Sequence, residues 1–238
     1  MSNIIAENIS KSYGSKDSQV TAISNMNFRI DSGEFVGVMG ESGAGKSTLL
    51  SIMGAMNSPT SGRYMVDGID VYDLSQEKQA DFRREFLGFV FQSFHLIPYL
   101  TVLENVMLPL TTINISRKQK RSMAKDTLAT VGLERKWMRL PSEISGGEKE
   151  RVAVARAIIN EPPILLADEP TGNLDTRNTH EVMELLCRLN EKGTTMVMVT
   201  HSAECAAYAG RIMNVADGKL MQEGQEGSVY VKVAAMAN

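Results

Sequence analysis

The chain has 238 residues, of which 25 are basic and 28 acidic, and hydrophobic residues make up 43% of it. This length suits one large α/β domain with a substantial core and room for a subdomain. A formal net charge of −3 argues against a dedicated nucleic-acid surface, which is usually basic, so we expect no nucleic-acid partner. No apolar run approaches the roughly 20 residues of a membrane-spanning helix. We therefore expect any membrane role to act through a partner.

The first part of the chain predicts strands. Residues 1–35 alternate apolar and polar side chains, which indicates antiparallel strands, and 35–39 is a continuous apolar strand. The pair Asp67-Gly68 inside residues 63–71 predicts a hairpin. A charged segment from 77 to 86 reads as a helix, and strand 87–91 follows it.

The middle of the chain changes to helical patterns, and the last part returns to strands. Thr101-x-x-Glu104 and Ser116-x-x-Gln119 are capping boxes that each open a helix, and residues 93–159 are interpreted as a helical insert. After it, the sequence predicts strand 164–167, a helix with an apolar face over 182–189, strand 195–200 and a closing hairpin over 211–218. This alternation predicts a mostly parallel sheet, in which a ligand would bind at the carboxyl ends of the strands.

The most informative pattern is G-x-x-x-x-G-K-S, which follows the apolar strand and precedes a helix. Its glycines allow backbone N–H groups to point at an anion, and the helix N-terminus adds partial positive charge. The lysine can reach the β- and γ-phosphates, and the serine hydroxyl can bind Mg²⁺. A glycine-rich turn with an accidental Lys-Ser is the alternative. The pattern predicts a nucleoside-triphosphate site at Gly40, Ser42, Gly43, Gly45, Lys46, Ser47 and Thr48.

A pair of carboxylates ends the strand predicted at 164–167. Asp168 at that position can hold Mg²⁺ through water beside the phosphates. Glu169 is suitably placed to orient or deprotonate an attacking water, and is therefore the candidate catalytic base. The alternative is a pair of solvated acids in a turn.

A third segment, Ser145-Gly146-Gly147-Glu148, opens another helix. It is itself a capping box, so a plain capped helix start is one interpretation. The functional interpretation is a second anion site, because a serine hydroxyl and glycine N–H groups at a helix N-terminus attract phosphate.

Together, Ser145-Gly146-Gly147-Glu148-x-x-Arg151, Asp168-Glu169 and the upstream phosphate loop resemble the ATP-binding-cassette (ABC) family over nearly the whole chain. The resemblance implies ATP and Mg²⁺ as ligands and a P-loop nucleotide-binding core from residues 1–92 and 160–238, with an antiparallel β subdomain. It also implies a second copy of the chain as partner, because the serine–glycine–glycine segment of one subunit closes over the ATP of the other.

Other residues match the family one by one. Tyr13 resembles the aromatic that stacks on adenine, although an exposed tyrosine at a strand end is the ordinary alternative. Gln92 resembles the glutamine that senses Mg²⁺, and His201 resembles the histidine that contacts the γ-phosphate. Gly172-Asn173-Leu174-Asp175 resembles the loop that contacts the opposite subunit.

One position departs from the commonest family pattern, which has glutamine where this chain has Glu148. A carboxylate near the phosphates would weaken anion binding unless it turns into the capping box. We expect little effect on ATPase activity.

The sequences of residues 85–92, 95–98, 100–106 and 166–175 resemble those of the lipoprotein-releasing and macrolide-exporter branch of the family. The resemblance implies an ATPase subunit that powers export, lipoprotein release or mechanotransmission. Its partner would be an integral membrane subunit with an extracytoplasmic domain, so the chain would lie on the cytoplasmic face of the inner membrane. The alternatives are a regulatory ATPase that signals through a membrane partner, as in the cell-division type, and a soluble ATPase of DNA repair or translation. Residues 94–110 are the candidate docking surface for that partner, and a packed loop is the alternative there.

Overall fold

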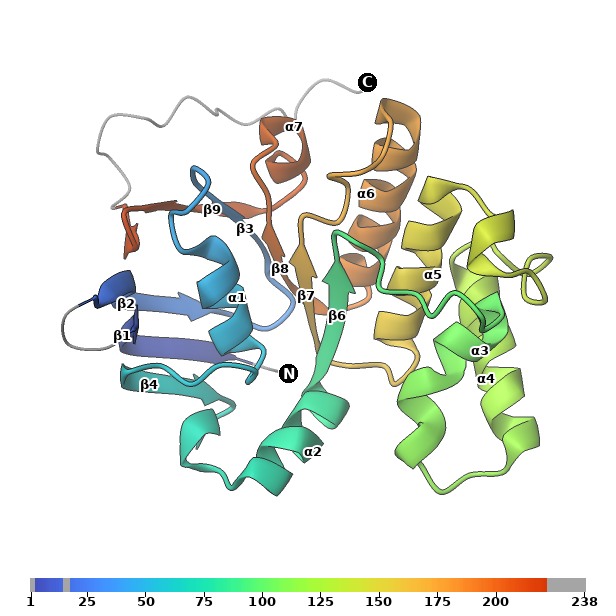
Figure 1. Ribbon diagram of the computed structural model, residues 1–238, viewed down its shortest axis with the longest axis horizontal. Coiled ribbons are helices and arrows are strands. Elements are labelled where there is room, and N and C mark those ends of the chain that lie inside the picture. The colour runs from blue at the N-terminus through green and yellow to red at the C-terminus, as the bar shows by residue number, and fades with distance from the viewer. Residues whose placement is uncertain (1–2, 15–17, 222–238) are drawn as a thin grey trace. The chain divides into compact units, whose positions relative to one another are not determined.

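The computed structural model describes residues 3–14 and 18–221 (Figure 1). The described residues within 1–79 and 195–238 form one compact unit, and residues 80–194 form another. We call them the first and the second unit. The last residues of the sequence, 227–238, for which no role was predicted, lie outside the described residues.

An antiparallel sheet in the first unit has the strand order β2-β1-β4-β5. Its strands are β1 (Ile4–Tyr13), β2 (Val20–Ile30), β4 (Ser61–Val66) and β5 (Ile69–Asp70). Asp67 and Gly68 both have positive φ, of 51° and 78°, as a two-residue hairpin of the type I′ kind requires. The predicted antiparallel strands and hairpin are confirmed, except that Val71 begins a short 3₁₀ helix, Val71–Asp73.

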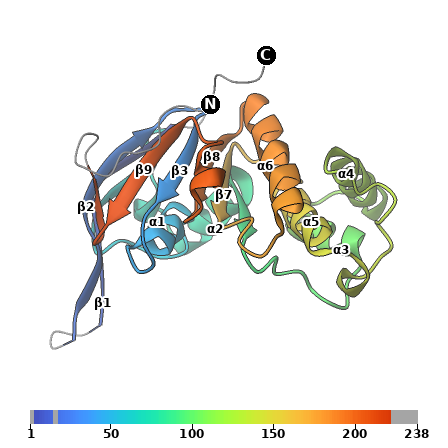
Figure 2. The same cartoon turned by 90° about the horizontal axis from the view of Figure 1, so that it is seen from above.

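The other strands of the first unit are mostly parallel. β3 (Phe35–Met39) pairs in parallel with β8 (Thr195–Val199) and with β9 (Arg211–Ala216), and β10 (Lys219–Leu220) adds an antiparallel edge. Figure 2 shows β3, β8 and β9 side by side. All of β8 and nearly all of β3 are buried, which explains why both read as continuous apolar runs rather than as alternating ones. Helix α1 (Lys46–Met53) packs against β8, and the short helix α7 (Ala203–Ala206) packs against β3.

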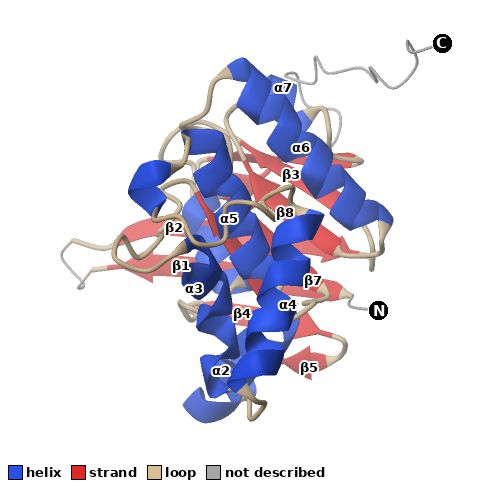
Figure 3. Cartoon of the chain, turned by 90° about the vertical axis from the view of Figure 1, so that its right-hand side faces the viewer, coloured by secondary structure: helices blue, strands red, loops and turns tan. Residues whose placement is uncertain are grey.

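Helix α2 (Gln76–Phe86) leads from the first unit into the second, where β6 (Leu87–Phe91) and β7 (Ile164–Asp168) form a parallel pair. The remaining elements are helical: α3 (Val102–Met107), a 3₁₀ helix (Leu108–Thr112), α4 (Arg117–Thr130), a 3₁₀ turn (Pro141–Glu143), α5 (Gly146–Ile158) and α6 (Thr176–Glu191). Helix α5 is central, because it packs against β6, α3, α4 and α6. Figure 3 shows α3 and α4 side by side.

The capping boxes predicted at the starts of α3 and α4 are both present. In each, the hydroxyl accepts from the third helical N–H, while the glutamate or glutamine side chain returns to the cap residue. Helix α4 ends where Gly132 adopts a φ of 72°, a conformation that glycine takes without steric cost. The helical character predicted for the middle of the chain is therefore confirmed, while the exact borders of the insert, 93 and 159, stay a prediction.

Within residues 3–14 and 18–221, no helix is long and apolar enough to span a bilayer.

Candidate functional site

The predicted phosphate loop in the first unit connects β3 to α1, as expected. A Cβ at position 40 would lie 2.1 Å from the Val215 carbonyl oxygen, and one at position 45 would lie 2.4 Å from the Ala22 carbonyl oxygen. Gly45 also has a φ of 102°. The loop can therefore keep this path only with glycine at both positions, because any larger residue would collide with backbone.

Lys46 is the buried cation of this loop, with only 7% of its surface exposed. Its ammonium group donates to the carbonyl oxygens of Gly40 and Glu41, both at 2.8 Å. Within the described residues Lys46 has no carboxylate partner. An ammonium group carries three donors, and a buried charge without a counter-ion is costly. This arrangement fits a bound phosphate, which would supply the missing negative charge.

The start of α1 offers further donors. No side chain caps this helix at Gly45, whereas Thr101, Ser116, Ser145, Asp175 and Ser202 cap the starts of α3 to α7. The first N–H groups of a helix lack intrahelical acceptors and attract anions. Ser42, Gly43 and Ser47 are exposed, and Thr48 is half-buried. The loop therefore presents unused N–H and hydroxyl groups to solvent.

His201 and Tyr13 are the other predicted site residues of the first unit. Val38 of β3 pairs in register with Val199 of β8, so Gly40 and His201 follow at the same carboxyl edge. The side chain of Tyr13 is 42% exposed, its hydroxyl accepts a hydrogen bond from Asn57 at 2.6 Å, and Lys11 lies 5.1 Å from its ring centre. Two polar contacts thus restrain this exposed ring.

In the second unit, the register of β6 and β7 brings three predicted residues together. Phe91 pairs with Asp168, so Gln92 immediately follows the residue opposite this carboxylate. Glu169 has a φ of 47°, a left-handed conformation that costs a non-glycine residue about 1–3 kcal/mol and that clusters at functional sites. The strand therefore ends abruptly at the second carboxylate, and the chain turns there.

The loop after Glu169 contacts Gln92. Asn173 donates through Nδ2 to the Gln92 carbonyl oxygen at 2.9 Å. A Cβ at Gly172 would lie 2.8 Å from Nε2 of Gln92. The glutamine and the loop predicted to face the opposite subunit are therefore packed together, and glycine at position 172 makes the room.

Ser145 caps α5 as predicted, with its Oγ accepting from the N–H of Glu148 at 3.3 Å. Glu148 turns back and accepts from the N–H of Ser145 at 2.8 Å, and its other oxygen lies 3.3 Å from Nζ of Lys136. The hydrogen bond from the Ser145 backbone, with a contribution from Lys136, lowers the pKa of Glu148. The departure from glutamine is thus accommodated, because this carboxylate is turned into the cap and neutralised by a lysine.

The two glycines of this segment lie against the start of α6. A Cβ at Gly147 would lie 1.9 Å from Oδ1 of Asn178, and one at Gly146 would lie 3.7 Å from Leu174. Asn178 in turn bonds Asp175 through both its backbone and its side chain, each at 2.8 Å. Glycine at position 147 therefore lets the starts of α5 and α6 approach closely.

The sequence did not single out the groups that hold the loop after Gln92. Arg156 of α5 donates to the carbonyl oxygens of Phe94 and His95, at 2.7 and 2.5 Å, and both residues have positive φ. Asn105, fully buried, accepts from the N–H of Ile97 and donates to three carbonyl oxygens between residues 97 and 101. No local pattern in the sequence reveals the role of Arg156, because the carbonyl groups that it binds lie 61 and 62 positions earlier in the chain. Tyr99 projects from this braced segment, 78% exposed.

No group of three or more His, Cys, Asp or Glu side chains converges as a metal site in the part of the chain that the structure describes. Cys187 and Cys205 are free thiols.

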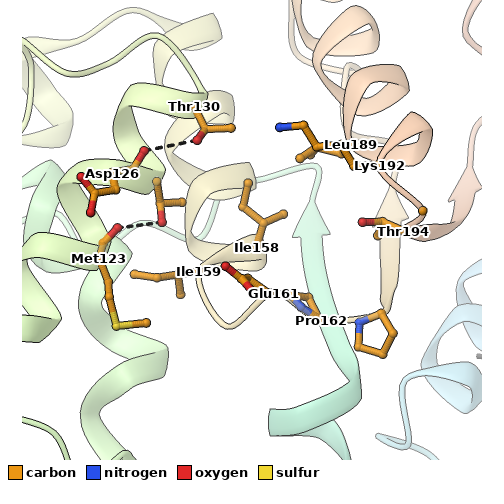
Figure 4. Close-up of a pocket in the computed structure, with 13 residues that line it drawn as sticks. Met123, Asp126, Thr130, Ile158, Ile159, Glu161, Pro162, Leu189, Lys192 and Thr194 are labelled. Atoms are coloured by element: carbon orange, nitrogen blue, oxygen red, sulfur yellow. Dashed lines mark hydrogen bonds between the residues drawn. The ribbon is translucent and has the colours of Figure 1, made fainter. Parts of the chain in front are cut away.

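A pocket of about 580 Å³ lies elsewhere in the second unit (Figure 4). Figure 4 shows Asp126 and Glu161 among the lining side chains, with apolar Met123, Ile158 and Leu189. None of the predicted nucleotide residues lines it, and its carboxylates would repel phosphate. This pocket is therefore not the candidate nucleotide site.

Comparison with known proteins agrees with the family resemblance predicted from the sequence. The model of the family described as "ABC transporter" matches residues 23–172. The lipoprotein-releasing system ATP-binding protein LolD of Geobacter metallireducens is 44% identical over 216 residues, which are 90% of this chain and 96% of LolD. The macrolide export ATP-binding/permease protein MacB of Vibrio parahaemolyticus is 38% identical over 99% of this chain, which corresponds to 36% of MacB.

A solved structure is also similar. The ATP-binding cassette MJ0796, in a dimeric post-hydrolysis state bound to ADP and Pi, has a TM-score of 0.85 and 42% identity, over 92% of this chain and 97% of that chain. This likeness confirms the predicted fold, an α/β P-loop cassette.

Proposed function

This chain belongs to the ABC transporter family as an ATP-binding and ATP-hydrolysing subunit of a membrane complex, and we propose that the residues described above form its ATP and Mg²⁺ site. The observation that carries the proposal is Lys46, a buried ammonium group that two carbonyls hold and that no carboxylate among the described residues neutralises. A phosphate chain completes this environment.

The remaining residues take the roles that their chemistry allows. Ser47, Asp168 and Gln92 would hold Mg²⁺, which when bound neutralises phosphate charge during phosphoryl transfer. Glu169 accepts a proton from, or orients, the attacking water. His201 contacts the γ-phosphate, and Tyr13 stacks on the base. The nucleotide-binding core would comprise residues 1–92 and 160–238, and the helical subdomain 93–159.

The site is proposed to close against a second copy of the chain. Ser145, Gly146, Gly147 and Glu148 would cover the ATP held by the loop of the partner copy. The cap geometry supports this, because Glu148 is neutralised by Lys136 and so does not repel phosphate. The similar cassette MJ0796 was solved as a dimer.

The membrane partner is proposed to be a separate subunit with an extracytoplasmic domain, which places this chain on the cytoplasmic face of the membrane. The names of the relatives LolD and MacB favour lipoprotein release or export over signalling without transport. Residues 94–110 would dock on that subunit, because Arg156 and Asn105 brace this segment while Tyr99 stays exposed.

The test is Glu169→Gln in the full chain. We expect ATP turnover to fall by about 10²–10⁴-fold, the usual worth of a general base, while ATP binding persists and size-exclusion chromatography shows an ATP-dependent dimer. Glu161→Gln is the matched control, since Glu161 is also a second-unit glutamate with positive φ, of 51°. Unchanged turnover in Glu169→Gln would contradict the assigned role. A monomer that persists with ATP would contradict the closing pair.

A further inference from the structure

Positive charge in this acidic chain is concentrated in one segment of the second unit. Residues 117–140 contain eight basic and two acidic residues, a surplus of six positive charges. The rest of the chain has 17 basic and 26 acidic residues. We call this segment, which comprises α4 and the turn after it, the basic strip. Such segregation indicates a surface that meets negative charge.

Most cations of the basic strip form no ion pair with the residues that the structure describes. Lys136 pairs with Glu148 and Arg139 with Glu143. The other six form no ion pair among the described residues: Arg117, Lys118, Lys120, Arg121, Lys125 and Arg135. Their side chains are exposed or half-buried. The positive electrostatic potential of the strip is therefore available to a negatively charged partner.

Apolar groups lie within the same strip. The ring of Trp137, the single tryptophan of the chain, has Lys125 at 4.1 Å and Arg121 at 5.7 Å from its centre. Met138 is 62% and Leu140 is 36% exposed. Tryptophan with basic and exposed apolar neighbours is the composition of surfaces that lie at a bilayer interface.

The backbone holds these groups against α3. The N–H groups of Val102 and Leu103 donate to the carbonyl oxygens of Arg139 and Trp137, at 2.8 and 2.9 Å. The turn after α4 is thereby attached to the first turn of α3, and α3 lies beside α4 (Figure 3). These backbone hydrogen bonds therefore fix the strip to the rest of the second unit.

We propose that the basic strip binds the anionic headgroups of the membrane surface, in addition to the contact that the chain makes with its membrane subunit. The six unpaired cations match the negative charge of phospholipid phosphates, and Trp137, Met138 and Leu140 supply the apolar contact that a purely ionic partner would not need. This binding orients the ATPase relative to the bilayer and takes no part in the nucleotide chemistry.

The experiment measures sedimentation of the full chain with vesicles of phosphatidylcholine, with and without phosphatidylglycerol, at low and high salt. We expect binding only to the vesicles with phosphatidylglycerol, and we expect salt to weaken it. Arg121→Glu combined with Lys125→Glu should weaken that binding by more than about tenfold. Met138→Ser should weaken it without any change in net charge.

The matched control is Lys78→Glu combined with Lys219→Glu, which changes the net charge equally at exposed first-unit positions. We expect this control to bind like the wild type, and all variants to keep the basal ATPase rate in the absence of vesicles. Equal vesicle binding by both double variants would overturn the proposal, as would no binding by the wild type. Loss of binding to the detergent-solubilised membrane subunit in the Arg121→Glu/Lys125→Glu variant would overturn it in favour of an acidic protein segment.

Discussion

Glu150 on α5 offers a quantitative test, because its side chain is wholly buried and neither carboxylate oxygen has a hydrogen-bond partner within the described residues. Burial raises the pKa of Glu150 from the ordinary 4.5 to about 9, against the opposing effect of the Arg156 charge. At pH 7 the carboxyl group is therefore protonated in the folded chain and ionised in the unfolded chain. Folding must then take up a proton at this position.

The free energy involved follows from the pKa of the unfolded state. Each unit by which the pH exceeds the pKa of the unfolded state costs the protonated folded state about 1.4 kcal/mol. Between the pKa of 4.5 and pH 7 this cost reaches roughly 3 kcal/mol. Glutamine has a similar shape and needs no proton. We expect Glu150→Gln to raise the free energy of unfolding at pH 7 by up to roughly 3 kcal/mol.

The pH dependence gives the sharper readout. The contribution of Glu150 to stability is fully present below pH 4.5 and is lost as pH rises towards 9. Urea unfolding followed by circular dichroism should therefore show that the advantage of Glu150→Gln over the wild type grows from pH 5 to pH 8.5. Glu134→Gln, at an exposed position, serves as the control and should track the wild type. A variant that is less stable than the wild type at every pH would refute the reasoning, because Glu150 would then be an ionised carboxylate with a partner.

Two further changes address the site. Lys46→Met should weaken binding of a fluorescent ATP analogue by about 10–100-fold, because one hydrogen-bonded charge is lost, and an unchanged dissociation constant would contradict the assigned phosphate contact. Gly147→Ala places a methyl group 1.9 Å from Oδ1 of Asn178, so we expect a loss of about 1–3 kcal/mol of stability in thermal unfolding. Adding Asn178→Ala should recover part of that loss, and no recovery would show that another contact is responsible.

Local patterns in the sequence predicted most of the elements correctly. The boxes at Thr101, Ser116 and Ser145 each need residues only three positions apart, and all three are formed. The hairpin at Asp67-Gly68 and the glycine-rich loop before α1 likewise depend on neighbours in the chain. Such features were predictable because their partners lie within one turn of helix or one hairpin.

The tertiary structure alone determined the environment of side chains whose partners lie far away in the sequence. Whether Glu148 would face an anion depended on Lys136, twelve positions away, and on the cap that it joins. Glu150 and Arg151 are adjacent charged residues in the sequence, yet Glu150 is wholly buried while Arg151 pairs with Glu181 of α6. The burial and charge environment of a side chain depend on which elements pack around it, and the residues that neutralise or bury it come from distant parts of the chain. For this reason the sequence predicted which residues could bind a phosphate, while only the packing of α5 determined which of its carboxylates remain charged.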